Sequence, residues 1–275
     1  MTRTLSGIVI VLVTVSAVLV SQLTLLLFAL LVTVVSMWEF LRLDKPVEGE
    51  RNPLSAIYPI LIGTCTVVLT YLATWNGYDF LLLLLPLVFT LFIVQLFRKH
   101  DVSPMNRIGR EIMAILYIAV PMALLAVLGK ETGEYGEPVY NAWFVLLYII
   151  LIWINDVGAY LVGVTLGKHR LCERLSPKKS WEGFFGGVLF TVVAACLLGP
   201  RITGLENTSL WGWIFFGIIL TLSAVAGDLV ESMFKREAGV KDSGNIIPGH
   251  GGFLDRFDSV FISIPFVYVM KLLMM

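Results

Sequence analysis

This sequence has few charged residues and long stretches that contain none. Of its 275 residues, 15% are charged and 57% are hydrophobic, whereas soluble domains are about 25% charged and roughly 45–50% apolar. The formal net charge is zero, which excludes the strongly basic surface typical of nucleic-acid-binding proteins. Several apolar stretches reach the roughly 20 residues that a helix needs to cross a bilayer. We therefore expect an integral membrane protein with little chain left for a soluble domain.

Cysteine-based metal motifs, a disulfide framework and a P-loop are also missing. The three cysteines show no CxxC spacing and no disulfide framework, so we expect them to be inert. The segment from Gly163 to Lys168 is not a phosphate-binding P-loop, because its spacing is short and His169 follows where Ser or Thr is needed. No convincing signal-peptide cleavage site follows the first apolar stretch, which we expect to be retained as a membrane span.

Nine apolar segments are candidate membrane-spanning helices. They cover residues 5–20, 22–41, 54–75, 79–97, 111–129, 141–166, 183–199, 210–231 and 258–274. The first two meet at Ser21-Gln22, which predicts a tight hairpin or a re-entrant pair. With a cytoplasmic N-terminus, 17 of the 20 Lys and Arg residues fall on the cytoplasmic side, as the positive-inside rule requires. We predict an all-α, polytopic membrane protein with about nine spans, a cytoplasmic N-terminus and a C-terminus on the opposite side.

Polar residues concentrate in the second half of the chain. We expect residues 1–140 to form a scaffold of five spans, and residues 141–275 to form a catalytic membrane region with cytoplasmic loops 167–182 and 232–257. An acid inside a span costs roughly 2.5–3.5 kcal/mol to insert. Acids, bases and glycines gathered at one membrane edge therefore indicate a functional site.

The end of the eighth span carries a polar helix face. Asp228, Glu231, Ser232 and Lys235 follow one another at helical spacing and share that face. Asp228 can belong to a structural ion pair with Lys or Arg, or it can hold a metal ion together with Asp255, which opens the ninth span. Carboxylate oxygens suit Mg²⁺, with Mn²⁺ as an alternative.

Three further features extend this candidate site. Asp258 lies one turn after Asp255 and can cap the ninth helix. Asn155-Asp156 places another acid in the sixth span, as a metal or headgroup ligand or as a helix-packing hydrogen bond. Ser176-Pro177-Lys178-Lys179 precedes a predicted helix start, where hydroxyl groups, ammonium groups and the helix N-terminus suit a triphosphate. The glycine pairs Gly163/Gly167 and Gly183/Gly187 predict close helix contact.

The C-terminal segment carries the most specific pattern. It reads Ser232-x-x-Lys235-Arg236-x4-Lys241-Asp242-x-Gly244-x3-Pro248-x-His250-Gly251-Gly252-x-x-Asp255-Arg256-x-Asp258. This pattern resembles the signature of the phosphatidate cytidylyltransferase (CDP-diacylglycerol synthase) family. Three more blocks resemble the same family: Asp156-x-x-Ala159-Tyr160, Ser176-Pro177-Lys178-Lys179-Ser180-Trp181-Glu182-Gly183, and Gly227-Asp228-x-x-Glu231-Ser232. Val164 departs from the family, whose members often carry Arg there.

The resemblance implies a reaction, a metal and a set of site residues. The expected reaction converts CTP and phosphatidate to CDP-diacylglycerol and pyrophosphate with Mg²⁺, in a homodimer in the cell membrane, or the inner membrane if the source is bacterial. We expect CTP, phosphatidate and membrane lipid as partners, and no nucleic acid. The implied residues are Asp228, Asp255, Lys235 and Lys241 for catalysis; Ser176, Lys178, Lys179, Ser232, Arg236, Asp242, His250 and Arg256 for substrate binding; and Asp228 and Asp255 for the metal, with Asp156 and Glu231 as further candidates.

Two other functions suit the same residue types. A CTP-dependent lipid kinase, such as a polyprenol or phytol kinase, also joins a nucleotide to a membrane substrate, but it leaves CDP and a phosphorylated alcohol. A secondary transporter also places acids inside spans. Against a transporter, the polar residues cluster at one face, and no pair of interrupted helices recurs in two halves of the chain.

Overall fold

The structure is a computed structural model that describes residues 2–43, 56–76, 79–98, 103–205, 208–247 and 251–274. It divides into two compact units. Unit 1 comprises residues 1–127 and 238–256, and unit 2 comprises residues 128–237 and 257–275. In the described part of the chain, seven helices are long and apolar enough to cross a membrane. The protein is therefore an all-α, multi-pass membrane protein, as predicted.

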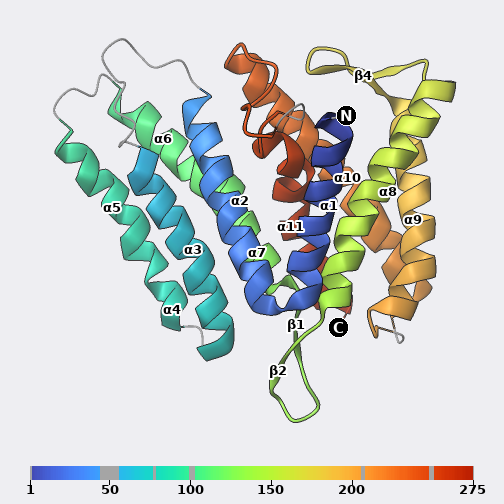
Figure 1. Cartoon of the computed structure of the whole chain (residues 1–275), viewed down its shortest axis with the longest axis horizontal. Coiled ribbons are helices and arrows are strands. Elements are labelled where there is room, and N and C mark those ends of the chain that lie inside the picture. Colours follow the sequence, from blue (N-terminus) through green and yellow to red (C-terminus); the bar gives the residue numbers. More distant parts are fainter. Residues whose placement is uncertain are drawn as a thin grey trace. The chain divides into compact units, whose positions relative to one another are not determined.

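Unit 1 is a bundle of the N-terminal helices (Figure 1). Its elements are α1 (Thr2–Val20), α2 (Gln22–Arg42), α3 (Ile57–Asn76), α4 (Asp79–Leu82), α5 (Leu84–Leu96), α6 (Pro104–Ala114), the π-helix η2 (Ile115–Ala119) and most of α7 (Val120–Leu128). Helix α2 packs against α3, and η2 contacts both. Apolar side chains such as Leu25, Met37 and Met122 are fully buried in this unit.

Ser21 is the whole connection between α1 and α2. Its hydroxyl accepts a hydrogen bond from the Thr24 amide at 3.1 Å, and the Thr24 hydroxyl accepts one from the Ser21 amide at 3.0 Å. This reciprocal capping box satisfies two backbone groups at the start of α2. The structure thus shows a tight turn between α1 and α2, and the choice between a membrane-spanning hairpin and a re-entrant pair stays a prediction.

Helices α6, η2 and α7 follow one another without a break. The π-turn comes directly before Pro121, which has no amide proton and would crowd the preceding turn of a regular α-helix. The wider π-turn accommodates the proline ring. Pro104 occupies the first turn of α6, where a proline is favourable. The helix therefore begins before the predicted span 111–129. The prediction leaves out residues 104–110 because they are too polar to belong to an apolar segment.

Unit 2 contains four long helices, α8 (Ala142–Leu166), α9 (Trp181–Ile202), α10 (Leu210–Glu237) and the larger part of α11 (Leu254–Met274). Two short antiparallel hairpins precede and follow α8 and lie near its opposite ends (Figure 1). One pairs β1 (Lys130–Thr132) with β2 (Pro138–Tyr140), and the other pairs β3 (Arg170–Cys172) with β4 (Ser176–Ser180). The sequence predicts loops at both places, since strands of three to five residues carry no readable period.

Glycines let α8 and α9 pack closely. A Cβ atom added to Gly183 would lie 2.8 Å from the Ala159 carbonyl oxygen and 3.1 Å from the Gly163 Cα. A Cβ atom on Gly187 would overlap the Asn155 Oδ1. The structure confirms the close helix contact that these glycines predict. Asn155 and Asp156 do not interrupt α8, which is continuous past both residues.

Each predicted span coincides with helix in the described ranges, with shifted boundaries. The ninth begins at Leu254 rather than at residue 258. The helices Leu5–Val20 and Leu84–Leu96 are apolar but short. The count of nine spans and the orientation of the termini stay predictions. The functional division at residue 140 also stays a prediction; the compact units divide at 127/128, and loop 238–256 belongs to unit 1.

Candidate active site

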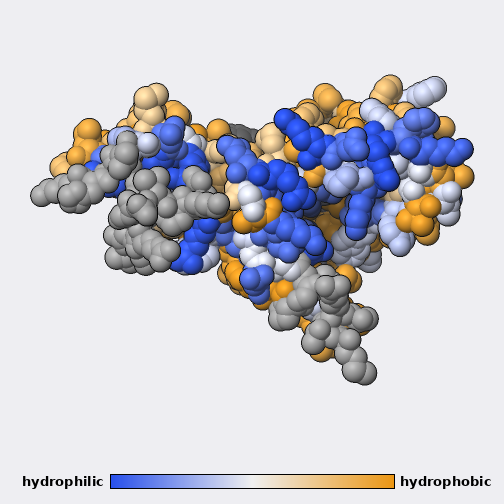
Figure 2. Space-filling model, turned by 90° about the horizontal axis from the view of Figure 1, so that it is seen from above, coloured by the Kyte–Doolittle hydropathy of each residue, from blue (hydrophilic) through white to orange (hydrophobic). Residues whose placement is uncertain are grey.

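A cavity of about 340 Å³ lies in unit 2, bounded by α8, the β3–β4 hairpin, the start of α9 and α10. The polar side chains that line it belong to Asn155, Asp156, Tyr160, Lys178, Lys179, Ser180 and Asp228. Figure 2 looks onto the molecule from above, and hydrophilic residues gather on its right, where the β3–β4 side of unit 2 lies. Three segments that the sequence analysis singles out separately thus meet around one volume.

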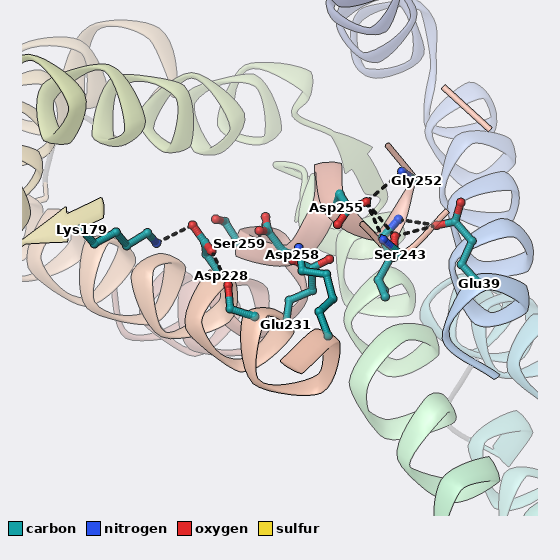
Figure 3. A network of polar contacts seen from close by, with 12 residues as sticks. Glu39, Lys179, Asp228, Glu231, Ser243, Gly252, Asp255, Asp258 and Ser259 are labelled. Atoms are coloured by element: carbon teal, nitrogen blue, oxygen red, sulfur yellow. Dashed lines mark hydrogen bonds and ion pairs between the residues drawn. The ribbon is translucent and has the colours of Figure 1, made fainter. Parts of the chain in front are cut away.

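The charged groups of the cavity meet in an ion pair between Lys179 and Asp228 (Figure 3). Both side chains are partly exposed, at 28% and 33%. Asp156 and Asp258 each interact electrostatically with Lys179 and with Asp228. The Lys179 ammonium group is thus ion-paired with Asp228 and interacts electrostatically with two further carboxyl groups.

Close packing of α10 on α11 brings Asp228 beside Asp258. A Cβ atom on Gly227 would overlap the carbonyl oxygen of Asp258, so the two backbones touch at this point. The Asp258 carboxylate also accepts a hydrogen bond from the Ser259 amide at 2.6 Å. From the sequence, Asp258 is predicted only to cap the ninth helix. Its position one helical turn after Asp255, at the start of an apolar helix, is the sequence feature that could have indicated a role in the site.

The β3–β4 hairpin is tied to the first turn of α9. Glu182 accepts hydrogen bonds from the Lys168 amide at 3.1 Å and from the His169 amide at 3.2 Å, and its Oε1 lies 2.6 Å from the His169 Nδ1. Ser180 caps α9 by accepting a hydrogen bond from the Gly183 amide at 3.1 Å. This arrangement holds β4 at a helix N-terminus, where the macrodipole favours anions. The predicted helix start after Lys178-Lys179 is confirmed.

The polar face of α10 forms as its spacing predicts. The Ser232 hydroxyl donates to Asp228 Oδ1 at 3.4 Å, and the Lys235 ammonium lies 2.6 Å from Glu231. Glu231 is buried, with a side chain that is 1% exposed. The charge of Lys235, a predicted catalytic residue, is thus matched by an acid on the same helix. Arg236 is exposed at the end of this face.

Asp255 belongs to a second polar group, in unit 1 (Figure 3). Its Oδ2 accepts hydrogen bonds from the Ser243 amide and hydroxyl, both at 2.9 Å, and from the Gly252 amide at 2.8 Å. Glu39 of α2 joins the same group, because its Oε2 accepts the Leu254 amide at 2.8 Å. Sequence analysis missed Glu39. The signal available was an acid within an apolar span, which is costly to insert.

The remaining predicted residues lie outside the cavity lining. Ser176 is half-buried at the start of β4, and Lys241, Asp242 and Arg256 are exposed residues of unit 1. His250 lies outside the described residues. Asp228 and Asp255 belong to different units, so their meeting at one metal ion stays a prediction. Within the described ranges, no group of three or more His, Cys, Asp or Glu has the arrangement of a metal site.

These features define a class of protein: a multi-pass membrane protein in which carboxylates, ammonium groups and a helix N-terminus surround a cavity. Residues 1–274 match the family model described as "Cytidylyltransferase family". The chain belongs to the cytidylyltransferase family.

Individual relatives support this assignment over the full length. The chain is similar to the phosphatidate cytidylyltransferase of Staphylococcus haemolyticus, at 30% identity over 276 residues that cover 99% of both chains. It is similar to that of Staphylococcus aureus (strain COL), at 31% identity over 272 residues that cover 98% of this chain and 97% of the relative. The phosphatidate cytidylyltransferase of Haemophilus influenzae is 43% identical over 143 residues, which cover 51% of this chain and 50% of the relative.

Proposed function

We propose that this chain is a phosphatidate cytidylyltransferase, which converts CTP and phosphatidate to CDP-diacylglycerol and pyrophosphate. The observation that carries the proposal is the cavity of unit 2, where Lys178 and Lys179 lie with Asp228 around one volume. The full-length similarity to proteins that carry this name supports the choice of reaction.

The cationic residues suit the charges of this reaction. A phosphate oxygen of the lipid attacks the α-phosphorus of CTP, a new P–O bond forms, and the bond to pyrophosphate breaks. Both reactants are anions, and two unit charges 4 Å apart repel by about 1 kcal/mol in water and by about 4 kcal/mol at an effective dielectric constant near 20. Lys178, Lys179 and the N-terminus of α9 lower this repulsion by binding the phosphates. Lipid phosphate is already largely ionised at neutral pH, so the reaction needs no side-chain nucleophile.

A divalent metal ion, Mg²⁺ or Mn²⁺, is part of the proposal. The donors are hard carboxylate oxygens, as these ions prefer. Three carboxyl groups interact with the single ammonium group of Lys179, and their oxygens are donors of the kind that an added cation would use. Asp228 and Asp255 would hold the ion, with Asp156 and Glu231 as further candidates. When bound, the ion would neutralise phosphate charge and help to align the in-line transfer.

The substrates determine where the reaction takes place. CTP reaches the protein from the cytosol, and phosphatidate lies in the membrane leaflet, so we place the site at the cytoplasmic interface of the cell membrane. For a bacterial source this is the inner membrane. We also propose a homodimer, on the resemblance alone, and no nucleic-acid partner.

The ion pair between Lys179 and Asp228 also suits the alternative in which Asp228 is purely structural. The partial exposure of both side chains at the cavity favours a functional role. A structural role predicts that Asp228→Asn lowers the stability of the protein. The proposal predicts that this variant stays folded in membranes and makes no CDP-lipid.

Position-specific labelling of CTP tests the proposed reaction. Detergent-solubilised protein is given phosphatidate, Mg²⁺ and CTP that carries ³²P at the α- or the γ-phosphate, with and without chelator. We expect the α-label in the lipid, the γ-label in pyrophosphate, and neither transfer when the chelator is present. A CTP-dependent kinase would instead place the γ-label on a lipid alcohol. Absence of the α-label from the lipid in the presence of Mg²⁺ would refute the proposal.

A further inference from the structure

Glu39 is a buried acid of α2 that the proposed reaction does not use. The residue is 4% exposed. Its Oε2 accepts a hydrogen bond from the Leu254 amide at 2.8 Å and lies 3.4 Å from the Ser243 hydroxyl oxygen. Its Oε1 is buried and has no hydrogen-bond partner among the residues that the structure describes. Because a buried carboxylate in a membrane span is costly, the contacts that Glu39 makes must offset that cost.

The first of these contacts caps a helix. Leu254 is the first residue of α11, and the amides of a first helical turn have no acceptor within their own helix. Glu39 supplies such an acceptor from α2, a distant part of the sequence. Its negative charge also suits the positive end of the helix dipole. Glu39 thereby fixes the position at which α11 begins, one residue before Asp255.

The second contact joins Glu39 to Asp255 through a serine. The Ser243 hydroxyl lies 2.9 Å from Asp255 Oδ2 and 3.4 Å from Glu39 Oε2. The two acids also interact electrostatically. Their mutual repulsion is offset by backbone donors, because the amides of Ser243 and Gly252 donate to Asp255 and the Leu254 amide donates to Glu39.

Glycines bring the loop backbone against the Glu39 carboxylate. A Cβ atom on Gly244 would overlap Glu39 Oε1, and one on Gly252 would overlap the Ser243 hydroxyl oxygen. Gly251 has a φ of 81°, which favours glycine. These glycines belong to the signature segment, and their small size here serves the approach of the loop to Glu39 and Ser243.

We propose that Glu39 is a positioning residue for Asp255. It holds the Leu254 amide directly before Asp255 and lies beside Ser243, which donates to Asp255, and so sets the direction of the Asp255 carboxylate. The inference rests on the proposed function, in which Asp255 is a metal ligand. Glu39 itself needs no contact with the substrate or the metal.

Hydrogen exchange tests the positioning without any use of activity. In detergent-solubilised Glu39→Ala, the amides of Gly252 and Leu254 should exchange about tenfold faster than in the wild type. The Leu254 amide loses its acceptor, and the Gly252 amide donates to an Asp255 carboxylate that is no longer held in position. Glu39→Gln keeps a carbonyl oxygen and should give an intermediate rate. Glu111→Ala is the matched control, since Glu111 is also a 4% exposed acid of unit 1 but pairs with Arg98 at 2.8 Å. Equal exchange in the wild type and both Glu39 variants would overturn the inference.

The metal requirement tests the functional consequence. Glu39→Ala should raise the Mg²⁺ concentration for half-maximal CDP-lipid synthesis about tenfold, with Glu39→Gln in between, while the CTP requirement at saturating Mg²⁺ changes little. A residue needed only for folding would lower the maximal rate and leave the Mg²⁺ requirement unchanged, and that result would contradict the inference. If the wild type made no CDP-lipid, the proposed function would fail, and the exchange measurement would still decide whether Glu39 holds the turn.

Discussion

Lys178 and Lys179 are neighbours in β4 but have different surroundings. Lys179 pairs with Asp228, whereas Lys178 is exposed and lines the same cavity. An ammonium group that already pairs with a carboxylate contributes less to anion binding than an ammonium group without such a pair. We therefore expect Lys178 to contribute more to phosphate binding than Lys179, whose charge is shared with Asp228.

Lys178→Ala should raise the CTP concentration needed for half-maximal rate by about tenfold or more, with a smaller effect on the maximal rate. The physical reason is the loss of a charge-assisted hydrogen bond to phosphate, which contributes roughly 1.5–3 kcal/mol. Steady-state kinetics with varied CTP measures the effect. Lys168→Ala is the control, because Lys168 lies outside the lining of the cavity. An unchanged CTP requirement in Lys178→Ala would remove this residue from the nucleotide site.

Lys179→Ala should lower the stability of the protein in chelator, and added Mg²⁺ should restore it. The substitution removes the ammonium group that pairs with Asp228 and interacts electrostatically with Asp156 and Asp258. Since the pair is partly exposed, we expect a loss of about 1 kcal/mol. The thermal unfolding midpoint, measured with and without Mg²⁺, checks this. A variant with wild-type stability in chelator would show that the acids do not depend on Lys179.

At the scale of helices and hairpins, the site depends on the close contact of α8 with α9. This contact places Asp156 of α8 near Lys179, which lies just before α9. The glycines that permit it have no room for a side chain. Gly163 and Gly183 also line the cavity, so the close packing of the two backbones helps to set its width.

Gly187→Val should lower the free energy of unfolding by about 1–3 kcal/mol and reduce the rate of CDP-lipid synthesis. The added atoms overlap Asn155, and overpacking of this kind forces helices apart. Gly109→Ala in α6 is the control, because a Cβ atom there meets nothing within 4 Å, and alanine favours a helix by roughly 1 kcal/mol over glycine. Normal stability and rate in Gly187→Val would contradict the packing argument.

The helices were predictable because their apolar stretches are long and uninterrupted. The tight turn at Ser21 and the start of α9 after Lys178-Lys179 were also visible in local residue types. The β1–β2 and β3–β4 hairpins were not, because two or three paired residues give no period. The start at Pro104 was hidden by the polar residues that follow it. Local signals thus located the spans and missed the short elements at their ends.

Across the whole molecule, the signature segment passes through both compact units. Residues 232–237 end α10 in unit 2, residues 238–256 belong to unit 1, and Phe257 and Asp258 return to unit 2. Its residues were identifiable from sequence because they are close in the chain. Glu39 was not, because its partners are more than 200 residues away. The grouping of Asp258 with Asp156 depends equally on packing between helices.

We propose that Asp228 and Asp255 together hold the metal ion for nucleotidyl transfer. Electron paramagnetic resonance of Mn²⁺ bound to the solubilised protein tests it in the wild type, in Asp228→Asn, in Asp255→Asn and in the double variant. We predict that each single variant loses the bound ion and that the double variant loses no more, because ligands of one ion act as a unit. Wild-type Mn²⁺ binding in either single variant would contradict the claim.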